Sequence, residues 1–302
     1  MLLNKFISKI NPSNNLPIDI KQSGYSKGLL AGHCTKTGKE VFLDYDRLVQ
    51  HVAISGSTGS GTSLLHKSLL KQHISNCGGL LFISGGLSDD ELTTIYDHVC
   101  LSGRKSDFIL IDTTDSENIS INLEECILEN KIVFVKFSII NDDENAVSLV
   151  KSIISDCRSA IARLQRLPVE KLPSPPFLFI PNNCSSYIDE SWSRMFEQGR
   201  SSRFAILPSF QTLKSLQPNG DELLSEIVLG NTYYKFFFKQ ASKEEAENTS
   251  NIIGMICGLN GNETYITEPE KIGSIPVGEC LLLVGNDDLY HLRLPNHNSS
   301  SD

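Results

Sequence analysis

The chain has 302 residues, of which 40% are hydrophobic and 21% charged, enough for one large α/β core or two smaller ones. The formal net charge of −9 argues against a protein that grips nucleic acid over its whole surface, although a local basic loop is left open. The eight cysteines are scattered, with no pair at zinc-ligand spacing, which predicts structural thiols in a reducing compartment.

The two ends of the chain are expected to lie outside the folded domain. Residues 1–26 begin with a short apolar run, MLLNKFISKI, which is shorter than the roughly 20 apolar residues of a membrane span. We interpret this N-terminal extension either as a small amphipathic helix that docks on a partner or as an end helix packed on its own domain. Residues 296–302 are polar and are predicted to form a disordered tail. With neither a signal peptide nor a span in the sequence, we expect a cytoplasmic protein.

Apolar runs alternate with amphipathic stretches over residues 27–295, which is typical of a parallel sheet covered by helices. A small β element at Gly28–Asp44 comes first, and the predicted strands that follow are His51–Ser55, Leu80–Ser84, Phe108–Asp112, Lys131–Ser138, Phe177–Ile180, Phe204–Ser209, Tyr233–Lys239 and Leu281–Val284. The predicted helices, in which apolar residues recur at helical spacing, are Thr62–Asn76, Asp90–Ser102, Asp143–Leu167, Glu222–Leu229 and Lys243–Ile253. We therefore predict one α/β domain with helices on both faces of a mostly parallel sheet.

The most informative stretch is HVAISGSTGSGTSLL, in which a strand ending at Ser55 meets a glycine-rich loop and then a helix. Glycines permit positive φ and close approach of the backbone, and successive N–H groups that run into a helix N-terminus form a nest for an anion. The spacing fits the phosphate-loop pattern GxxxxGK[ST] at every fixed position except the lysine. The predicted nucleotide-binding residues are Gly56, Ser57, Thr58, Gly59, Ser60, Gly61, Thr62 and Ser63.

Position 62, where the pattern requires lysine, is threonine. The lysine ammonium bridges the β- and γ-phosphates during transfer, whereas Thr62 offers a neutral hydrogen bond of roughly half the strength. Lys67 lies five residues further along the helix and is not expected to point into the loop. Ser63 keeps the hydroxyl that would hold a metal ion. We therefore predict that ATP and Mg²⁺ bind weakly or no longer bind, and that hydrolysis is lost.

The second catalytic motif of P-loop ATPases, an aspartate and usually a glutamate at the end of a later buried strand, is also missing. The candidate strand is PPFLFIPNNCSSY, in which apolar residues lead directly into Pro181, Asn182 and Asn183. Asp189 and Glu190 follow, and we expect them on the next helix as solvated surface charges. The joint loss of the lysine and both carboxylates predicts a decayed catalytic centre, that is, a pseudo-ATPase.

Taken in order, several segments resemble the motor domain of type IV coupling proteins, the TraD- and TraG-like ATPases of conjugation and type IV secretion that are related to FtsK and HerA. These segments are HVAISGSTGSGTSLLHKSLLKQHISNCGGLLFIS, DDELTTIYDHVCLSGRKSDFILID, MFEQGRSSRFAILPSFQTLKSL, VLGNTYYKFFFKQASKEEAEN and the closing hairpin GECLLLVGNDDLYHLRLP. The resemblance runs from about Lys27 to Pro295, and it implies a RecA/FtsK-like P-loop NTPase fold with a C-terminal hairpin. It also implies an oligomer with sites between subunits, held at the inner membrane only through partners.

The sequence departs from the family pattern in three places. The Asp-Pro-Lys that usually follows the second strand is replaced by Ser84, Gly85 and Gly86, and the family's membrane anchor is not found. The all-α domain that these proteins insert after the Ile111–Asp112 strand is reduced to a connection over Thr113–Asn130. Because that domain is implicated in DNA or substrate engagement, its reduction leaves open whether this chain contacts DNA.

Three further residues carry roles only through the resemblance. Gln211 would be the sensor of the γ-phosphate or of water, and the alternative, which the missing catalytic pair favours, is a buried amide bonded to the sheet edge. Arg200 or Arg203 would act as an arginine finger toward the nucleotide of a neighbouring subunit. The alternative for both arginines is an ordinary ion pair on a surface or interface.

The leading hypothesis is a catalytically inactive coupling-protein-like subunit, a component or regulator of a conjugation or type IV secretion system. It would act as a homo- or hetero-oligomer by docking on a coupling-protein ATPase or on another secretion component.

A second hypothesis is an ATP-hydrolysing motor for DNA or effector protein, with a metal carboxylate supplied by Asp112, Asp115, Glu190 or Glu197. A third is a regulator that binds ATP without cleaving it. DNA binding without catalysis is disfavoured by the net charge and by the aromatic run Phe236–Phe238, which we interpret as core.

Overall fold

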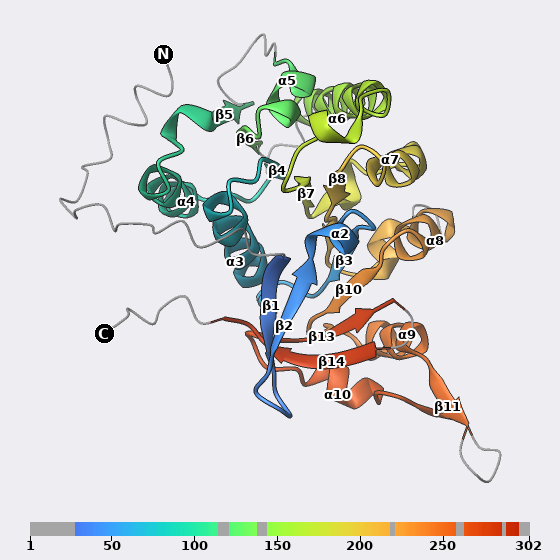
Figure 1. The fold of residues 1–302 in the computed structure, drawn as a ribbon. Helices are drawn as coiled ribbons and strands as arrows, with labels where there is room; N and C mark the ends of the chain where they lie inside the picture. The colour runs from blue at the N-terminus through green and yellow to red at the C-terminus, as the bar shows by residue number, and fades with distance from the viewer. Residues whose placement is uncertain are drawn as a thin grey trace.

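The computed structural model describes residues 28–113, 121–137, 144–217, 221–257, 263–285 and 288–295 (Figure 1). The expected extension over residues 1–26 and the tail over 296–302 lie outside the described residues. The strands are β1 (Gly28–Cys34), β2 (Glu40–Asp44), β3 (Val52–Ser55), β4 (Leu80–Ser84), β5 (Phe108–Asp112), β6 (Ile132–Lys136), β7 (Phe177–Asn182), β8 (Phe204–Ile206), β9 (Ser209–Phe210), β10 (Tyr234–Phe237), β11 (Met255–Cys257), β12 (Glu263–Tyr265), β13 (Glu279–Val284) and β14 (Asp288–Arg293). The helices are α2 (Tyr45–Leu48), α3 (Thr62–Ser75), α4 (Asp89–Leu101), α5 (Leu123–Leu128), α6 (Glu144–Leu164), α7 (Trp192–Gly199), α8 (Leu223–Gly230), α9 (Lys243–Ile253) and α10 (Pro269–Gly273).

Most strands belong to one long sheet built from two hydrogen-bonded parts. The first part has the order β5-β6-β4-β7-β8 and is parallel throughout. The second has the order β2-β1-β14-β13-β10-β3-β9; it is parallel across β10, β3 and β9 and antiparallel elsewhere. The two parts meet where the chain passes from β8 to β9. There the N–H of Leu207 donates to the carbonyl of Phe179 at 2.8 Å, and the N–H of Ile54 donates to that of Pro208 at 3.0 Å.

Pro208 explains why the strand expected over Phe204–Ser209 is split into β8 and β9. Proline has no N–H to donate to a ladder, so a central strand breaks where it occurs. The break lets the same segment pair first with β7 and then with β3. The prediction of a mostly parallel sheet is confirmed, and β3, which leads into the glycine-rich loop, lies inside the sheet with a parallel neighbour on each side.

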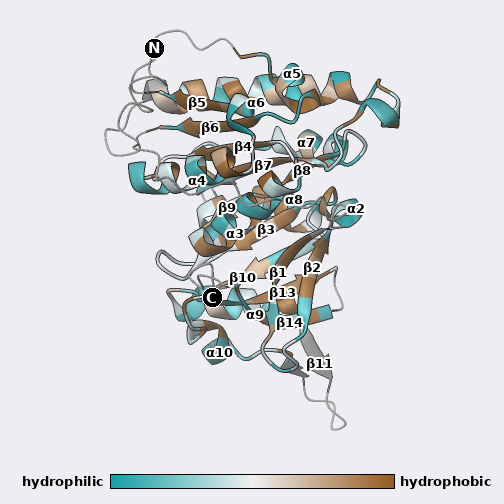
Figure 2. Cartoon of the chain, turned by 60° about the vertical axis from the view of Figure 1, so that its left-hand side comes forward, coloured by the Kyte–Doolittle hydropathy of each residue, from teal (hydrophilic) through white to brown (hydrophobic). Residues whose placement is uncertain are grey.

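Helices cover both faces of the sheet, as the alternation of the sequence predicts (Figure 1). In β4, Leu80 and Phe82 pack with α3 and α4, whereas Leu81 and Ile83 pack with α6 and α7 on the opposite face. This alternation follows from the two-residue period of a strand. Figure 2 shows the result as a mostly apolar layer of strands between helices with more hydrophilic outer surfaces.

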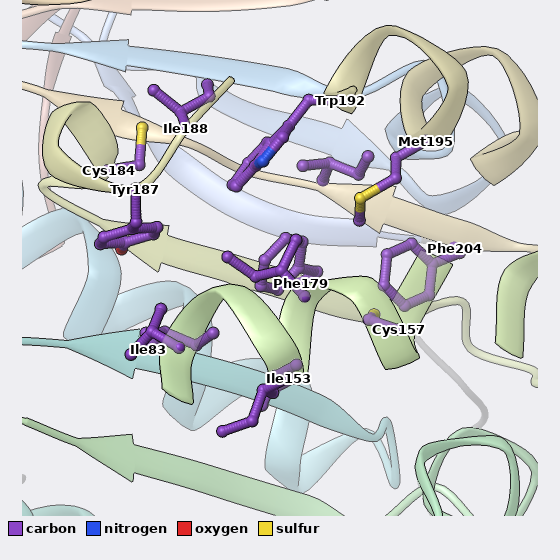
Figure 3. Packing of buried hydrophobic residues seen from close by; sticks show 14 of the residues in the cluster. Ile83, Ile153, Cys157, Phe179, Cys184, Tyr187, Ile188, Trp192, Met195 and Phe204 are labelled. Atoms are coloured by element: carbon purple, nitrogen blue, oxygen red, sulfur yellow. The ribbon is translucent and has the colours of Figure 1, made fainter. Parts of the chain in front are cut away.

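The larger of the two main cores is centred on Trp192, the first residue of α7, which is completely buried (Figure 3). Its indole lies 5.4 Å from the ring of Phe179 in β7 and 6.5 Å from the ring of Tyr187, measured between centroids. Cys157 and Cys184 fill the same cluster and are fully buried, as expected of structural thiols. This packing holds β7, and therefore Asn182 at its end, against α6 and α7.

The predicted bounds of β4, β5 and α9 agree with the structure to the residue. The helix α5, inside the connection expected over Thr113–Asn130, was not predicted because its six residues are too few to show a helical period. The hairpin of β11 and β12 and the short helix α10 were also not predicted. Within the described ranges, no helix combines the length and apolar character that crossing a membrane requires.

Candidate functional site

The loop between β3 and α3 has the backbone of an anion nest. Gly61 is the N-cap of α3 with φ of +112°, and no side chain caps this helix. The first N–H groups of an α-helix have no partner within the helix, so those of Thr62 and Ser63 are open to a ligand. A helix N-terminus with free N–H groups and a favourable dipole binds anions. The described backbone therefore fits a phosphate group, as the sequence predicts.

Neighbouring strands hold the loop in place. The N–H and the hydroxyl of Ser57 both donate to the carbonyl of Lys239 just after β10, at 3.0 and 2.9 Å. The N–H of Gly56 donates to the carbonyl of Phe210 at the end of β9, at 3.2 Å. A Cβ atom at Gly56 would come within 2.5 Å of Cβ of Phe238, so the loop can pass the Phe238 side chain only with glycine at this position. The nest is thus fixed on both sides of β3.

The cations near the loop do not replace the missing lysine at position 62. Lys67, on the second turn of α3, places its Nζ 2.8 Å from Oε1 of Glu91 on α4. Lys67 is thus paired with a carboxylate, although it lines one small cavity with Ser63. Lys239 has an exposed side chain without an ion pair in the part of the chain that the structure describes, and its carbonyl anchors Ser57. The main chain of Lys239 thus borders the nest, and its exposed ammonium is a candidate cation for a bound phosphate.

Glu91 lies close to the loop, although the sequence argument did not single it out. A small cavity of about 50 Å³ separates Glu91 from Ser63 and Asn182. Burial raises the pKa of the Glu91 carboxyl, but hydrogen bonds from Lys67 and from the N–H of Ser88 outweigh this effect, so the net shift is downward. The capping box that Ser88 and Glu91 form at the start of α4 is the sequence signal that could have located this carboxylate.

Asn182 ends β7 where a P-loop ATPase carries its metal-binding carboxylate. Its Nδ2 donates to Oγ of Ser84 at 3.0 Å, and its Oδ1 accepts from Oγ of Ser209 at 2.8 Å. Both polar atoms of the amide are thus used to tie the ends of β4 and β9 to β7. The donor set is neutral, and within the described ranges no group of three His, Cys, Asp or Glu side chains could hold a metal ion. These residues do not fit a Mg²⁺ ion held by protein carboxylates.

Other carboxylates considered from the sequence lie away from the loop. Asp189 and Glu190 are exposed, as expected, but they precede α7, so the expectation that they lie on the helix is wrong. The Asp189 carboxylate accepts a hydrogen bond from the N–H of Ser191 at 2.9 Å, which stabilises the turn into α7. Asp112 ends β5 at the outer edge of the sheet, and Glu197 lies on α7. Asp115 lies outside the described residues.

Gln211 lies beside the loop. It follows β9 directly, and the preceding carbonyl, of Phe210, accepts from Gly56. Its side chain is exposed and makes no hydrogen bond to the described residues, so the interpretation as a buried amide is wrong. The position suits a sensor, and that role stays a prediction.

The two arginines lie at the opposite end of β3 from the loop. Arg200 follows α7 and lines a cavity together with Val49–His51, the segment that precedes β3. The Nε of Arg203 donates to the carbonyl of Pro173 at 3.0 Å, and its guanidinium pairs with Asp46 at 3.4 Å. Neither arginine approaches the loop of its own chain, so a role toward another subunit's nucleotide stays a prediction.

Two curated relatives are similar to parts of the sequence, and no family model matches it. The type 4 coupling protein DotL of Legionella pneumophila is 28% identical over 107 residues, which are 35% of this chain and 14% of DotL. An uncharacterized protein of Mycoplasma pneumoniae is 37% identical over 67 residues, which are 22% of this chain and 55% of that protein. The matches thus span about a seventh of the first relative and about half of the second.

Solved structures match over nearly the whole chain. The unbound bacterial conjugative coupling protein TrwB superposes with a TM-score of 0.62 at 9% identity, covering 91% of this chain and 90% of TrwB. TrwB in complex with ADP and Mg²⁺ gives 0.62 at 10% identity, with the same coverage. VirB4 of Thermoanaerobacter pseudethanolicus gives 0.63 at 12% identity, covering 90% and 97%. The resemblance to type IV coupling proteins and the P-loop NTPase fold are thereby confirmed at the level of the fold.

Proposed function

We propose that this chain is a catalytically degenerate coupling-protein-like subunit that binds a nucleoside triphosphate weakly and does not hydrolyse it. It acts in the cytoplasm as a component or regulator of a conjugation or type IV secretion system, associated with a coupling-protein ATPase or another secretion component. The observation that carries this proposal is the contrast between a complete backbone nest and the neutral side chains of Thr62 and Asn182.

Binding and hydrolysis depend on different parts of the site. The N–H groups at the start of α3 would hold the phosphates of ATP, whose binding energy then comes from neutral donors and the helix dipole. Phosphoryl transfer is catalysed almost entirely by positioning and by electrostatic stabilisation of charge on the transferred group. The lysine and the metal carboxylate supply that stabilisation in active enzymes, and neither is present at positions 62 and 182. Binding can therefore survive where hydrolysis does not.

An active motor is the second candidate, and the exposed Gln211 beside the loop favours it. Such a motor needs a carboxylate for its metal ion. Asp112 lies on β5, five strand spacings from β3, or about 24 Å at the usual distance between strands. Glu197 lies with Arg200 around the cavity at the other end of β3. Among the described residues, Glu91 shares a cavity with Ser63 and Asn182 but is paired with Lys67, so a motor would have to use Glu91 released from Lys67 or a carboxylate from a neighbouring subunit.

A turnover and titration experiment separates the two candidates. For the purified chain we expect no magnesium-dependent ATP hydrolysis above background. In calorimetry we expect ATP to bind with a Kd of about 0.1–1 mM. Lys239→Ala should weaken this binding by about twofold to fivefold, because an exposed cation contributes less than about 1 kcal/mol. Lys243→Ala, an exposed lysine paired with Glu247 on α9, is the matched control and should leave the affinity unchanged. Magnesium-dependent turnover that Gln211→Ala abolishes would instead establish the motor.

The assembly role requires a separate experiment. We expect the chain to co-purify with a coupling-protein ATPase encoded in the same genome, and its deletion to change the efficiency of DNA or protein transfer. A chain that neither associates with such an ATPase nor affects transfer would refute the proposed role, whatever its affinity for ATP.

A further inference from the structure

A second site lies at the other end of the sheet from the nucleotide loop. A cavity of about 600 Å³ opens there between the ends of α7 and α8, the segment before β3 and the start of β10. A volume of this size is typical of small-molecule sites in proteins. Its walls include the apolar side chains of Val49, Phe196 and Leu229.

The cavity contains a buried lysine without a counter-ion. Lys235, on β10, is only 6% exposed and still lines the cavity. Its Nζ donates to the carbonyl of Thr232 at 2.5 Å, and no carboxylate lies within 4 Å of it among the described residues. Tyr234 and Phe236, its neighbours on the strand, belong to the apolar core of the opposite face.

An unpaired buried ammonium destabilises the fold unless something compensates its charge. Burial is the cause that lowers the pKa of Lys235 in this structure. A methionine or leucine would fill the same space without this cost. A lysine at this position therefore calls for a partner, and the cavity gives a partner access to it.

The other polar groups of the cavity restrict what that partner can be. Arg200 is exposed at the end of α7 and has no ion pair in the described part of the chain, while Glu197, one turn earlier, adds a negative charge to the same wall. His51 is not available to a ligand, because its Nε2 binds the carbonyl of Phe196 at 2.7 Å and its Nδ1 accepts from the N–H of Ile206 at 3.1 Å. The charges of Arg200 and Glu197 offset each other, which leaves one buried cation to be balanced.

We propose that this cavity is a binding site for a small monocarboxylate with an apolar body, whose carboxylate pairs with the ammonium of Lys235. One buried positive charge matches a single negative charge, whereas a phosphate dianion would bring a second charge next to Glu197. The partly exposed side chains of Leu229 and Tyr233 in the cavity lining offer contact to the hydrocarbon part of the ligand, whose burial contributes about 0.8 kcal/mol per methylene group.

The test titrates the full chain with linear carboxylates from acetate to octanoate by calorimetry. We expect the affinity to rise with chain length and to fall at least tenfold in Lys235→Met. Octanol, which has the same apolar body without the charge, should bind at least tenfold more weakly than octanoate. Lys243→Met, at an exposed lysine on α9 that does not line the cavity, is the matched control and should bind octanoate like the wild type.

Two outcomes would overturn the proposal: equal affinity for octanol and octanoate, or unchanged octanoate binding in Lys235→Met. If Lys235→Met does not fold, Gly230→Trp replaces it, because Gly230 is exposed in the cavity lining and a Cβ atom there meets nothing within 4 Å. The indole should block the cavity, so an affinity for octanoate equal to that of the wild type would then refute the site. The site is independent of the proposed function, since ATP binding at the glycine-rich loop should be the same in all of these variants.

Discussion

Thr62→Lys is expected to tighten ATP binding by about 10- to 100-fold, because a hydrogen bond from a charged group contributes about 1.5–3 kcal/mol. The backbone that would direct the new ammonium is already in place, since Gly61 begins α3 without a side-chain cap and Ser57 is anchored to Lys239. Lysine also has a higher helix propensity than threonine, so the substitution should not disturb the first turn.

The measurement is calorimetry with ATP, with and without Mg²⁺, on the wild type and three variants. Thr94→Lys is the matched control for adding the same charge to an exposed helical threonine, on α4, and should leave the affinity unchanged. Lys67→Met removes the lysine bound to Glu91 and should change the affinity by less than about twofold, since exposed or half-exposed pairs contribute little. Tight binding by the wild type with no gain in Thr62→Lys would contradict the proposal that the site has decayed.

Magnesium provides an internal check on the same experiment. Asn182 offers a neutral amide that is hydrogen-bonded to Ser84 and Ser209 where an active enzyme has a carboxylate, so Thr62→Lys should restore phosphate affinity without restoring that metal ligand. A gain in affinity that appears equally with and without Mg²⁺ would agree with this description. A gain that requires Mg²⁺ would point to a carboxylate ligand, for which Glu91 in the cavity beside Ser63 and Asn182 is a candidate.

Features determined by local pattern could be predicted from the sequence. The strand β4 is an apolar run bounded by glycines on both sides, and its limits were predicted to the residue. The loop Gly56–Ser63 follows from its spacing alone, and its position between β3 and α3 is confirmed. Asn182 was predicted two residues beyond the strand Phe177–Ile180, because an apolar run leads toward it, and in the structure β7 extends to Asn182 itself.

Features that depend on contacts between distant segments could not be predicted. Gln211 is exposed because the strand before it breaks at Pro208 and pairs with β3, which no local pattern shows. Lys235 is buried and lies in the wall of a cavity that residues of α7, α8 and β10 line together, which no local pattern shows. The pairing of Lys67 with Glu91 likewise joins two helices whose relative position is set by the sheet.

Stability is expected to fall steeply as the pH decreases from 6.5 to 5. Three buried histidines are the reason: burial lowers the pKa of His51 and His66 to about 4 and that of His73 to about 3. Between these values and 6.5 the unfolded chain binds protons that the folded chain does not, so the free energy of unfolding decreases as the pH falls. Below pH 6.5, each histidine lowers the free energy of unfolding by up to about 1.4 kcal/mol per pH unit. The three together therefore lower it by about 6 kcal/mol at pH 5.

His66→Met tests this assignment because Nε2 of His66 has no hydrogen-bond partner among the described residues, so removing the imidazole costs little of the native structure. His51 and His73 are unsuitable for the same test, since their rings bind the main chain at Phe196 and Gly79.

Urea denaturation at pH 7 and pH 5.5 should show the wild type losing stability between the two pH values, and His66→Met losing about one third less. His33→Gln, at an exposed histidine, should follow the wild type. Equal stability of the wild type at both pH values would mean that the three rings are accessible to protons in the folded chain, against the packing of His66 on Phe82 and of His73 on Tyr45.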